Sequence, residues 1–327
     1  MAADPPGRTD PTGLESSMPE LPEVEVVRRG LDKWVRHRRI DAVEVLDPRS
    51  TRRHVDGSED FQQTLTGCTV ASVVRRGKFL WMELDGLDTP AALVAHLGMS
   101  GQLLIEESDA PDEKHLKVRL SLSDLVDAPA ELRFVDQRIF GGMFLSPLVP
   151  TADGNAAGSG STSAFIPQAA AHIARDVLDP VRSVEDLYLS LRGKTTQLKR
   201  AILDQAIISG VGNIYADEAL WQAGISGLRN TATIRRNEVS RLNDALIDVM
   251  TRALAAGGTS FDSLYVNVNG ASGYFARSLN AYGREGKPCL RCQDNGRESL
   301  IRRDPFMGRS SYTCPVCQPR PRRQSRG

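Results

Sequence analysis

Four of the five cysteines in this 327-residue chain form two Cys-x-x-Cys pairs close to its C-terminus. Two such pairs on neighbouring turns can hold one Zn²⁺ tetrahedrally, and the bound metal then stabilises a segment too short to build its own apolar core. A site closed by four thiolates leaves no coordination position for chemistry, so we expect one structural Zn²⁺ per chain. Its ligands would be Cys289, Cys292, Cys314 and Cys317. The 21 residues between the pairs slightly exceed the usual spacing of about 15–20, which predicts an insertion at 293–298.

The chain before this metal motif divides into a strand-like half and a helical half. After a helix at about 22–35, short β-type runs alternate with turn residues; the expected strands are 68–74, 79–84, 92–97, 102–105, 116–122, 131–135 and 142–145. Apolar residues then recur three or four positions apart, which predicts helices at 184–191, 198–206, 213–223 and 237–256. We therefore expect a multidomain α and β protein. It would have an N-terminal β-sandwich with flanking helices, a helical domain and a C-terminal zinc ribbon.

Composition suggests where the domains meet. Residues 151–163 are rich in Gly, Ala and Ser without any periodicity, so we interpret them as a linker or insertion. Residues 1–17 are polar and rich in Pro, Gly, Asp and Ser, and we expect them to be disordered, as either a mis-called start or a dispensable tail. The expected boundaries are 18–150 for the β-sandwich, 164–283 for the helical domain, 284–318 for the zinc finger and 319–327 for a basic disordered tail.

The net charge of zero would argue against a nucleic-acid partner, but the charges are unevenly distributed. Residues 284–327 carry eleven Lys and Arg against four acidic residues, whereas residues 1–17 carry one Arg against three acidic residues. The C-terminal segment is therefore a basic appendage on a mildly acidic body.

We find no apolar run long enough to cross a bilayer and no charged-then-apolar leader, so we expect no membrane partner and a cytoplasmic location. Cysteines paired for a metal also indicate a reducing compartment and not a disulfide framework, and we expect the remaining Cys68 to be a buried small apolar residue.

The segment from Met18 to Glu25 has a chemical meaning only if the working protein begins there. Removal of Met18 would leave Pro19 as an N-terminal secondary amine, and an α-amine titrates at about pH 8, so an unprotonated fraction can attack an electrophilic carbon at neutral pH. Glu20, adjacent to it, is then the best candidate for general acid/base work. The alternative is an ordinary helix start, because Pro22 followed by acidic residues suits the positive end of a helix dipole.

A Gly-rich turn, Gly210-Val211-Gly212-Asn213, separates two of the expected helices. Backbone N–H groups and an Asn amide presented by such a turn suit a phosphate group. The alternative is an ordinary helix cap, which two glycines beside an asparagine also form.

Several separated motifs together resemble one family, the formamidopyrimidine-DNA glycosylases, which are bacterial base-excision enzymes that remove oxidised purines from DNA. The resemblance extends from Met18 to about Cys317. Its motifs are the PELPEVE start followed by Arg28-Arg29-Gly30, then 76–78, 96–101, 136–141, 212–216, 273–275 and the four-cysteine tail. It implies a bifunctional DNA glycosylase/AP lyase with a helix–two-turn–helix domain and a zinc finger, acting as a monomer on double-stranded DNA that contains an oxidised purine or an abasic site.

The resemblance also implies roles for individual residues. Pro19 would form a Schiff base at the sugar C1′ and lead to β,δ-elimination, assisted by Glu20, by Lys78 as a proton donor and by Arg309 in the second elimination. His115, Arg138, Lys194 and Asn213 would bind phosphates, while Met99, Arg138 and Phe140 would fill the gap left by the extruded nucleotide. Glu23, Glu218, Tyr274 and Tyr282 would shape or support the base pocket. The loop 268–274 would cover the extruded base.

Two departures from the family pattern and two competing interpretations remain. Ile139 stands where many relatives have a second arginine, so one phosphate contact is missing unless a neighbouring arginine replaces it. The 17-residue extension, if retained, would acylate the Pro19 nitrogen and abolish its chemistry.

The sister endonuclease VIII group removes oxidised pyrimidines but usually opens with Pro-Glu-Gly-Pro, whereas Leu21 here favours the purine branch. The other alternative is a non-catalytic, zinc-dependent binder of DNA lesions whose N-terminus stays blocked.

Overall fold

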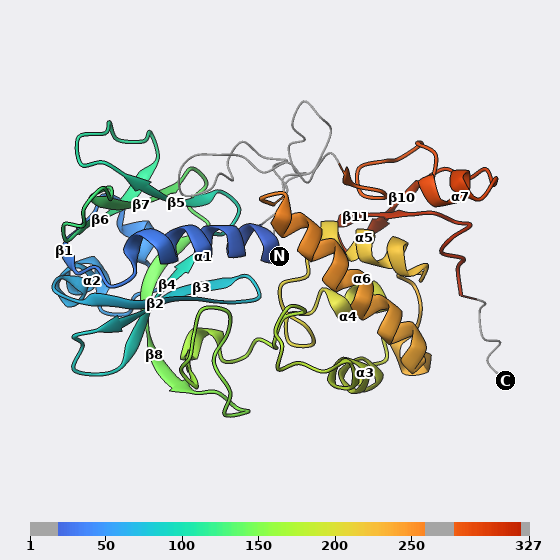
Figure 1. The fold of residues 1–327 in the computed structure, drawn as a ribbon, viewed down its shortest axis with the longest axis horizontal. Helices are drawn as coiled ribbons and strands as arrows, with labels where there is room; N and C mark the ends of the chain where they lie inside the picture. The colour runs from blue at the N-terminus through green and yellow to red at the C-terminus, as the bar shows by residue number, and fades with distance from the viewer. Residues whose placement is uncertain (1–18, 259–277, 322–327) are drawn as a thin grey trace. The chain divides into compact units, whose positions relative to one another are not determined.

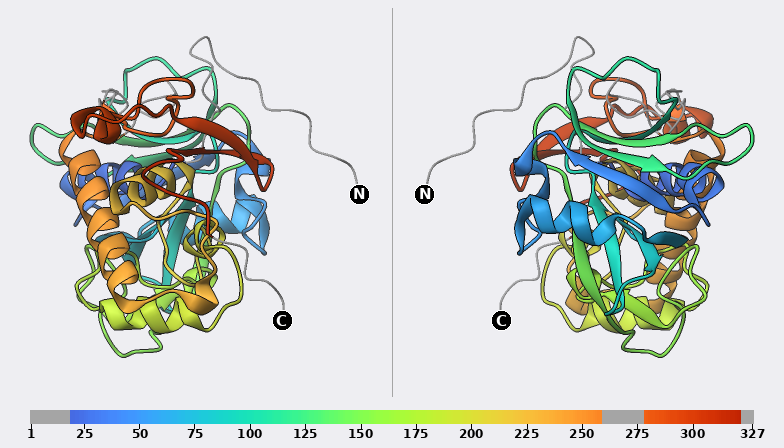
Figure 2. Two further views of the ribbon diagram at one scale, coloured as in Figure 1. Left: turned by 90° about the vertical axis from the view of Figure 1, so that its right-hand side faces the viewer. Right: turned by 90° about the vertical axis from the view of Figure 1, so that its left-hand side faces the viewer.

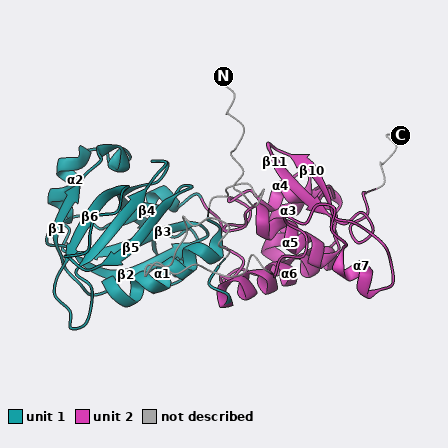
Figure 3. Cartoon of the chain, turned by 90° about the horizontal axis from the view of Figure 1, so that it is seen from above, with its two compact units in different colours: residues 1–172, 256–274 teal, residues 173–255, 275–327 magenta. Residues whose placement is uncertain are grey.

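The computed structural model describes residues 19–258 and 278–321. Figure 1 shows its elements in chain order. The chain divides into two compact units, residues 1–172 with 256–274 and residues 173–255 with 275–327 (Figure 3). Among the described residues no helix is both long and apolar enough to cross a membrane.

The first unit contains two antiparallel sheets. One sheet has the strand order β1 (Ile40–Val45), β6 (Leu116–Leu122), β7 (Glu131–Asp136) and β5 (Gly101–Glu106). The other has the order β2 (Thr69–Arg76), β3 (Phe79–Asp85), β4 (Ala91–His96), β8 (Gly142–Pro150) and β9 (Phe165–Pro167). The helices are α1 (Leu21–Val35) and α2 (Gly57–Leu65), with short 3-10 turns η1 (Pro48–Thr51) and η2 (Gln168–Ala170).

Apolar side chains from both sheets form one buried core. Strands β2 to β4 contribute residues such as Val73 and Leu93, and β6 and β7 contribute residues such as Leu120 and Phe134. Helix α1 adds a stripe of apolar residues three or four positions apart, Val24, Val27, Leu31 and Val35. Two sheets that share one core through alternating inward side chains form a sandwich, which confirms the expected fold of this region.

The seven strands expected from the sequence are all present, with ends shifted by a few residues. Strand β1 and helix α2 were not expected as separate elements. Each buries few side chains, Ile40 in β1 and Phe61 with Leu65 in α2, so the apolar signal in the sequence is weak. Residues 151–163 lie against β2, because Arg75 and Ser159 exchange two backbone hydrogen bonds of 3.0 and 2.9 Å. A Cβ atom at Gly158 would approach the Arg75 carbonyl oxygen to 2.3 Å, so the glycines of this segment permit close backbone packing.

The second unit is mainly helical and carries a two-stranded hairpin. Its elements are α3 (Val184–Arg192), α4 (Leu198–Ile202), α5 (Asn213–Ala223), η3 (Thr231–Thr233), α6 (Arg236–Ala255), α7 (Leu290–Asp294), β10 (Arg302–Phe306) and β11 (Arg309–Thr313). Helix α6 packs against α5 and α3, and the hairpin strand β11 packs against α5 (Figure 2). Helix α5 is buried over most of its surface and ends at Ala223, and the next residue, Gly224, has a left-handed φ of 66° that suits glycine.

One expected helix is shorter than the sequence pattern predicts. The periodicity indicates a helix over 198–206, but α4 ends at Ile202. The Asp204 carboxylate accepts a hydrogen bond from the Ala206 N–H at 3.0 Å, which is a local turn that competes with helical bonding. The expected helices at 184–191, 213–223 and 237–256 are confirmed to within one residue.

Candidate active site and nucleic-acid interface

Pro19 and Glu20 are buried immediately before helix α1, and Glu20 is only 2% exposed. Glu20 and Glu23 form a capping box, in which the Glu20 N–H donates to the Glu23 Oε2 at 3.0 Å and the Glu20 side chain accepts from the Glu23 N–H. The first helical turn therefore fixes both carboxylates beside Pro19. Gly258 also lies close to Glu23, because a Cβ added there would come within 3.3 Å of its side chain.

A buried ion-pair cluster ties α1 to the β2–β3 hairpin. Glu25 accepts hydrogen bonds from Arg28 at 3.0 Å and from Arg75 at 2.8 Å, and Arg75 also donates to the Gly77 carbonyl at 3.1 Å. Burial raises the pKa of Glu25, but the two arginines outweigh it and lower the pKa to about 2, so this carboxylate stays ionised. Arg75 thus connects the helix behind Pro19 and Glu20 to the turn that carries the half-buried Lys78.

The proposed void-filling residues come from two neighbouring loops of the first unit. Phe140 is 54% exposed, and the Arg138 Nη1 lies 3.9 Å from the Met99 sulfur. Arg138 and Phe140 belong to the segment 137–141 between β7 and β8, which we call the wedge loop. Met99 lies between β4 and β5. The structure therefore places Arg138 against Met99, and Arg138 and Phe140, on the same loop, are both exposed.

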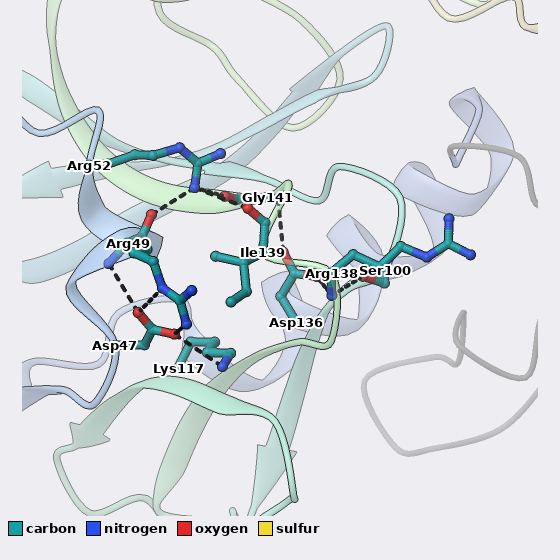
Figure 4. Close-up of polar contacts among 9 residues, drawn as sticks. All are labelled: Asp47, Arg49, Arg52, Ser100, Lys117, Asp136, Arg138, Ile139 and Gly141. Carbon is teal, nitrogen blue, oxygen red and sulfur yellow. Dashed lines mark hydrogen bonds and ion pairs between the residues drawn. The ribbon is translucent and has the colours of Figure 1, made fainter. Parts of the chain in front are cut away.

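The wedge loop is held from inside by one buried carboxylate (Figure 4). Asp136 is fully buried and accepts hydrogen bonds from the backbone N–H groups of Arg138 and Gly141 at 3.1 and 2.8 Å. The Ser100 hydroxyl donates to the same carboxylate at 2.5 Å and accepts from the Arg138 N–H at 3.0 Å. Since Asp136 N–H donates to the His115 carbonyl at 3.0 Å, the segment that carries His115 is tied to this loop as well.

Ile139 has a left-handed backbone conformation, with φ at 57°. This conformation costs an L-residue about 1–2 kcal/mol, and β-branched side chains tolerate it least. The Ile139 side chain is half-buried and extends toward Arg49 and Lys117 in Figure 4. The strain lies in the loop that carries Arg138 and Phe140, and the surrounding hydrogen bonds must hold the loop against it.

His96, which the sequence places only within the motif 96–101, is a further candidate site residue and lies beside the wedge loop. Its Nδ1 is buried and has no hydrogen-bond partner among the residues the structure describes. Burial, followed by the charges of Arg53 and Arg52, lowers the pKa of His96 to about 4. The imidazole is therefore neutral at pH 7, with a buried ring nitrogen that no described residue bonds.

In the second unit, Asn213 begins helix α5 and is only 4% exposed. Its amide nitrogen donates to the Ser310 carbonyl at 2.9 Å, which links the Gly-rich turn to the β10–β11 hairpin. Lys194 and Arg309 are both exposed. Arg309 follows a two-residue turn in which Met307 and Gly308 both have positive φ, the geometry of a tight hairpin.

Buried carboxylates on α5 fix the segments around this hairpin. Asp217 accepts from the Tyr312 N–H at 2.9 Å and pairs with the buried Lys199 at 2.7 Å, while burial raises its pKa to about 6. Glu218 accepts from the N–H groups of three consecutive residues that end at Tyr282, with distances of 2.7 to 3.1 Å. Glu218 therefore fixes the backbone of the segment that ends at Tyr282. The expected pocket residue Tyr274 and the loop 268–274 lie outside the described residues.

The four expected metal ligands converge. The Sγ–Sγ distances are 3.8 Å for Cys289–Cys317, 3.7 Å for Cys292–Cys314 and 3.4 Å for Cys292–Cys317. Sulfurs about 2.3 Å from one tetrahedral metal ion would be about 3.8 Å apart, so the cluster fits such an ion. The indole N–H of Trp221 lies 3.3 Å from the Cys289 sulfur, and the Ser299 hydroxyl lies 3.2 Å from the Cys314 sulfur. These donors favour thiolates, and the cluster can therefore bind a metal ion.

Comparisons with known proteins agree with this architecture. The model of the formamidopyrimidine-DNA glycosylase N-terminal domain matches residues 18–143, and the model of the formamidopyrimidine-DNA glycosylase H2TH domain matches residues 173–264. The formamidopyrimidine-DNA glycosylase of Kineococcus radiotolerans is 55% identical over 312 residues, which cover 93% of this chain and 99% of that protein. The Streptomyces coelicolor enzyme of the same name is 54% identical over 305 residues, with the same coverage.

Solved structures show the same similarity. A variant of the Lactococcus lactis Fpg in complex with Fapy-dG-containing DNA has a TM-score of 0.74 and 30% sequence identity, over 92% of this chain and all of that one. MutM in complex with DNA that contains carbocyclic 8-oxo-G has a TM-score of 0.73 at 29% identity. The fold and these relatives define a DNA glycosylase of base-excision repair. The chain belongs to the formamidopyrimidine-DNA glycosylase family.

Proposed function

We propose that the protein excises oxidised purines, including 8-oxoguanine and formamidopyrimidines, from double-stranded DNA and then cleaves the strand at the abasic site. The observation that carries this proposal is the buried Pro19-Glu20 pair at the start of α1, within a chain that matches the family over nearly its whole length. The match to the family's N-terminal model begins at residue 18, one position before this proline.

The proposed reaction begins when the Pro19 nitrogen, freed by loss of the preceding residues, attacks the sugar C1′. The bond from C1′ to the base breaks as the bond to nitrogen forms, and the nitrogen loses its proton. The C1′–O4′ bond then breaks as O4′ takes up a proton, which opens the sugar ring and leaves an iminium that accepts electrons. Loss of the C2′ proton then expels the 3′ phosphate, and a second elimination expels the 5′ phosphate. Glu20, held by the capping box, is the candidate acid/base for the sugar oxygen and C2′, and Arg309 is the candidate for the second elimination.

We assign DNA binding to residues of both compact units. Met99, Arg138 and Phe140 would occupy the gap left by the flipped nucleotide, with the guanidinium directed to the unpaired base. His115, Lys194 and Asn213 would contact phosphates, and Glu23, Glu218 and Tyr282 would support the base pocket. The Asn213 amide already donates to the hairpin carbonyl of Ser310, so a phosphate contact through this amide would be shared with that bond.

The metal is proposed to be Zn²⁺, because a closed set of four thiolates suits its tetrahedral preference. It would hold the β10–β11 hairpin and take no part in the reaction. We also expect the enzyme to act as a monomer on the bacterial nucleoid, since its substrate is chromosomal DNA.

The test of this function compares a duplex with one oxidised purine and a duplex with a preformed abasic site. The form beginning at Pro19 should cleave both. Lys78→Ala should reduce base removal by about 10²-fold, the scale of a lost proton-transfer group, while cleavage of the abasic duplex falls much less because Pro19 and Glu20 remain. Single-turnover rates on denaturing gels measure both steps.

Lys33→Ala is the matched control, because it removes the same charge from the exposed surface of α1. It should leave both rates nearly unchanged. Equal losses on the two duplexes in Lys78→Ala would assign Lys78 to general DNA binding. Preference of the wild type for a duplex with an oxidised pyrimidine would contradict the proposed substrate class.

Ile139→Arg tests the missing phosphate contact. Each phosphate neutralised by a cation contributes about −0.9 to the slope of log affinity against log salt concentration on duplex DNA. The substitution should therefore steepen that slope by about one unit and tighten non-specific binding, with little gain in discrimination. Arginine also tolerates the left-handed backbone at this position better than isoleucine does. Fluorescence-anisotropy titrations over a salt series measure the slope, and an unchanged slope would show that position 139 does not face the DNA backbone.

A further inference from the structure

A single guanidinium group binds the outer side of the wedge loop. Arg52, at the C-terminal end of η1, donates from Nη1 to the carbonyls of Ile139 at 3.1 Å and Gly141 at 3.3 Å, and from Nη2 to the Phe140 carbonyl at 3.3 Å. Its Nη1 also donates to the Arg49 carbonyl at 2.7 Å. Figure 4 shows this guanidinium lying over the loop backbone. Three consecutive carbonyls of the wedge loop therefore meet one cation.

The loop needs such a partner because its backbone is unusual. Three successive carbonyl groups can point toward one cation only if the chain departs from regular geometry, and Ile139 does so with its left-handed φ of 57°. The N–H groups of Arg138 and Gly141 in the same loop point inward to the fully buried Asp136. Asp136 thus binds the donors of the loop and Arg52 binds its acceptors, which together specify a single loop conformation.

Close packing below the loop leaves it little room to relax. A Cβ added at Gly98 would lie 2.6 Å from the Gly141 nitrogen, so the β4–β5 turn and the wedge loop touch through their backbones. On the other side, a Cβ at Gly142, just after the loop, would lie 2.4 Å from the Ser50 carbonyl oxygen in η1. Arg52, exposed at the end of the same turn, adds its hydrogen bonds to the loop carbonyls on this side.

We propose that Arg52 is a positioning residue for nucleotide extrusion: it holds the wedge loop, before DNA binds, in the conformation that presents Arg138 and Phe140. This inference rests on the void-filling roles proposed above for those two side chains. A wedge that is already in place requires no ordering of the loop when the duplex opens, which favours rapid extrusion. Arg52 acts here through the loop and not through contact with the reacting sugar.

A simpler role for an exposed arginine is a contact with a DNA phosphate. Such a role would make Arg52 equally important on damaged and undamaged DNA and would change the salt slope. It would not change the loop in the free protein. Exchange of the loop amides in the absence of DNA therefore separates the two roles.

The experiment compares Arg52→Gln with Arg49→Gln. Both remove one positive charge from the same short segment, but the side chain of Arg49 bonds Asp47, at 2.8 and 3.0 Å, and not the wedge loop. Hydrogen–deuterium exchange of the free protein should show the Arg138 and Gly141 amides exchanging about tenfold faster in Arg52→Gln, the effect of losing roughly 1.4 kcal/mol of local stability. Arg49→Gln should leave these amides within about twofold of wild type.

Extrusion is measured separately, by stopped-flow fluorescence of 2-aminopurine placed beside the lesion. Arg52→Gln should slow the extrusion phase about tenfold, and Arg52→Lys should recover only part of it, because an ammonium lacks the planar fork that reaches several carbonyls. Unchanged amide exchange in Arg52→Gln would overturn the positioning role. Faster exchange with an unchanged extrusion rate would also overturn it, and would show in addition that the wedge loop does not carry the proposed void-filling function.

Discussion

The form of the protein that begins at Pro19 should be trapped covalently on lesion-containing DNA by borohydride, whereas a form that retains residues 1–17 should give at least about 10²-fold less trapped complex. The physical reason is that a peptide-bonded proline nitrogen is an amide without a basic lone pair, so it cannot form the iminium that borohydride reduces. Loss of a nucleophile commonly costs several orders of magnitude in rate. Denaturing gels that resolve the cross-linked species measure the yield, with intact-mass spectrometry to verify each N-terminus.

The control for this comparison is the binding step. Both forms should bind a duplex with an uncleavable abasic-site analogue, because the retained extension changes the nucleophile and not the phosphate contacts. If the extended form bound and trapped as well as the shorter one, Pro19 would not be the nucleophile. Trapping that survives replacement of Pro19 in the shorter form would lead to the same conclusion.

The sequence predicted most elements of both units because each carries a local signal. Strands β2 to β8 alternate with turn residues, α1 has an apolar stripe, and the paired cysteines have metal-ligand spacing. Helix α4 is the instructive exception. Its apolar periodicity continues past Ile202, but the Asp204 side chain bonds the backbone locally and ends the helix.

The partnerships that hold the proposed site residues in place could not be predicted in this way. Glu25 and Arg75 are 50 positions apart in the chain, and Arg52 lies 87 positions from Ile139. Each of these charged residues, taken alone, is typical of a solvated surface. Only the tertiary fold makes Glu25 an ionised buried carboxylate and Arg52 the partner of three loop carbonyls. The same holds for the left-handed Ile139, because β-branched residues rarely adopt that conformation and no sequence signal predicts it.

The metal cluster leads to the second large effect. Cys314→Ser should reduce bound zinc from one ion per chain to nearly none and weaken binding to lesion DNA by at least about 10²-fold. The Cys314 sulfur lies 3.7 Å from that of Cys292 and accepts from the Cys317 N–H at 3.3 Å, so its loss opens the cluster.

Loss of the metal should release the β10–β11 hairpin, because structural zinc contributes about 10–16 kcal/mol to the folding of small zinc domains. Arg309 would then no longer be presented on a fixed turn. The first unit should remain folded, since its core of two sheets and α1 contains none of the four ligands.

Cys68→Ser is the matched control: this buried thiol lies in the first unit and donates to the Thr64 carbonyl at 3.1 Å. Atomic absorption measures the bound metal, anisotropy titration measures the DNA affinity, and hydrogen exchange reports on the β-sandwich. Cys68→Ser should keep both its metal and its DNA affinity. Cys314→Ser should lose both, but its β-sandwich should be unchanged. A Cys314→Ser protein that kept its zinc would refute the ligand assignment, and one that lost zinc but bound DNA at full affinity would remove the hairpin from the DNA interface.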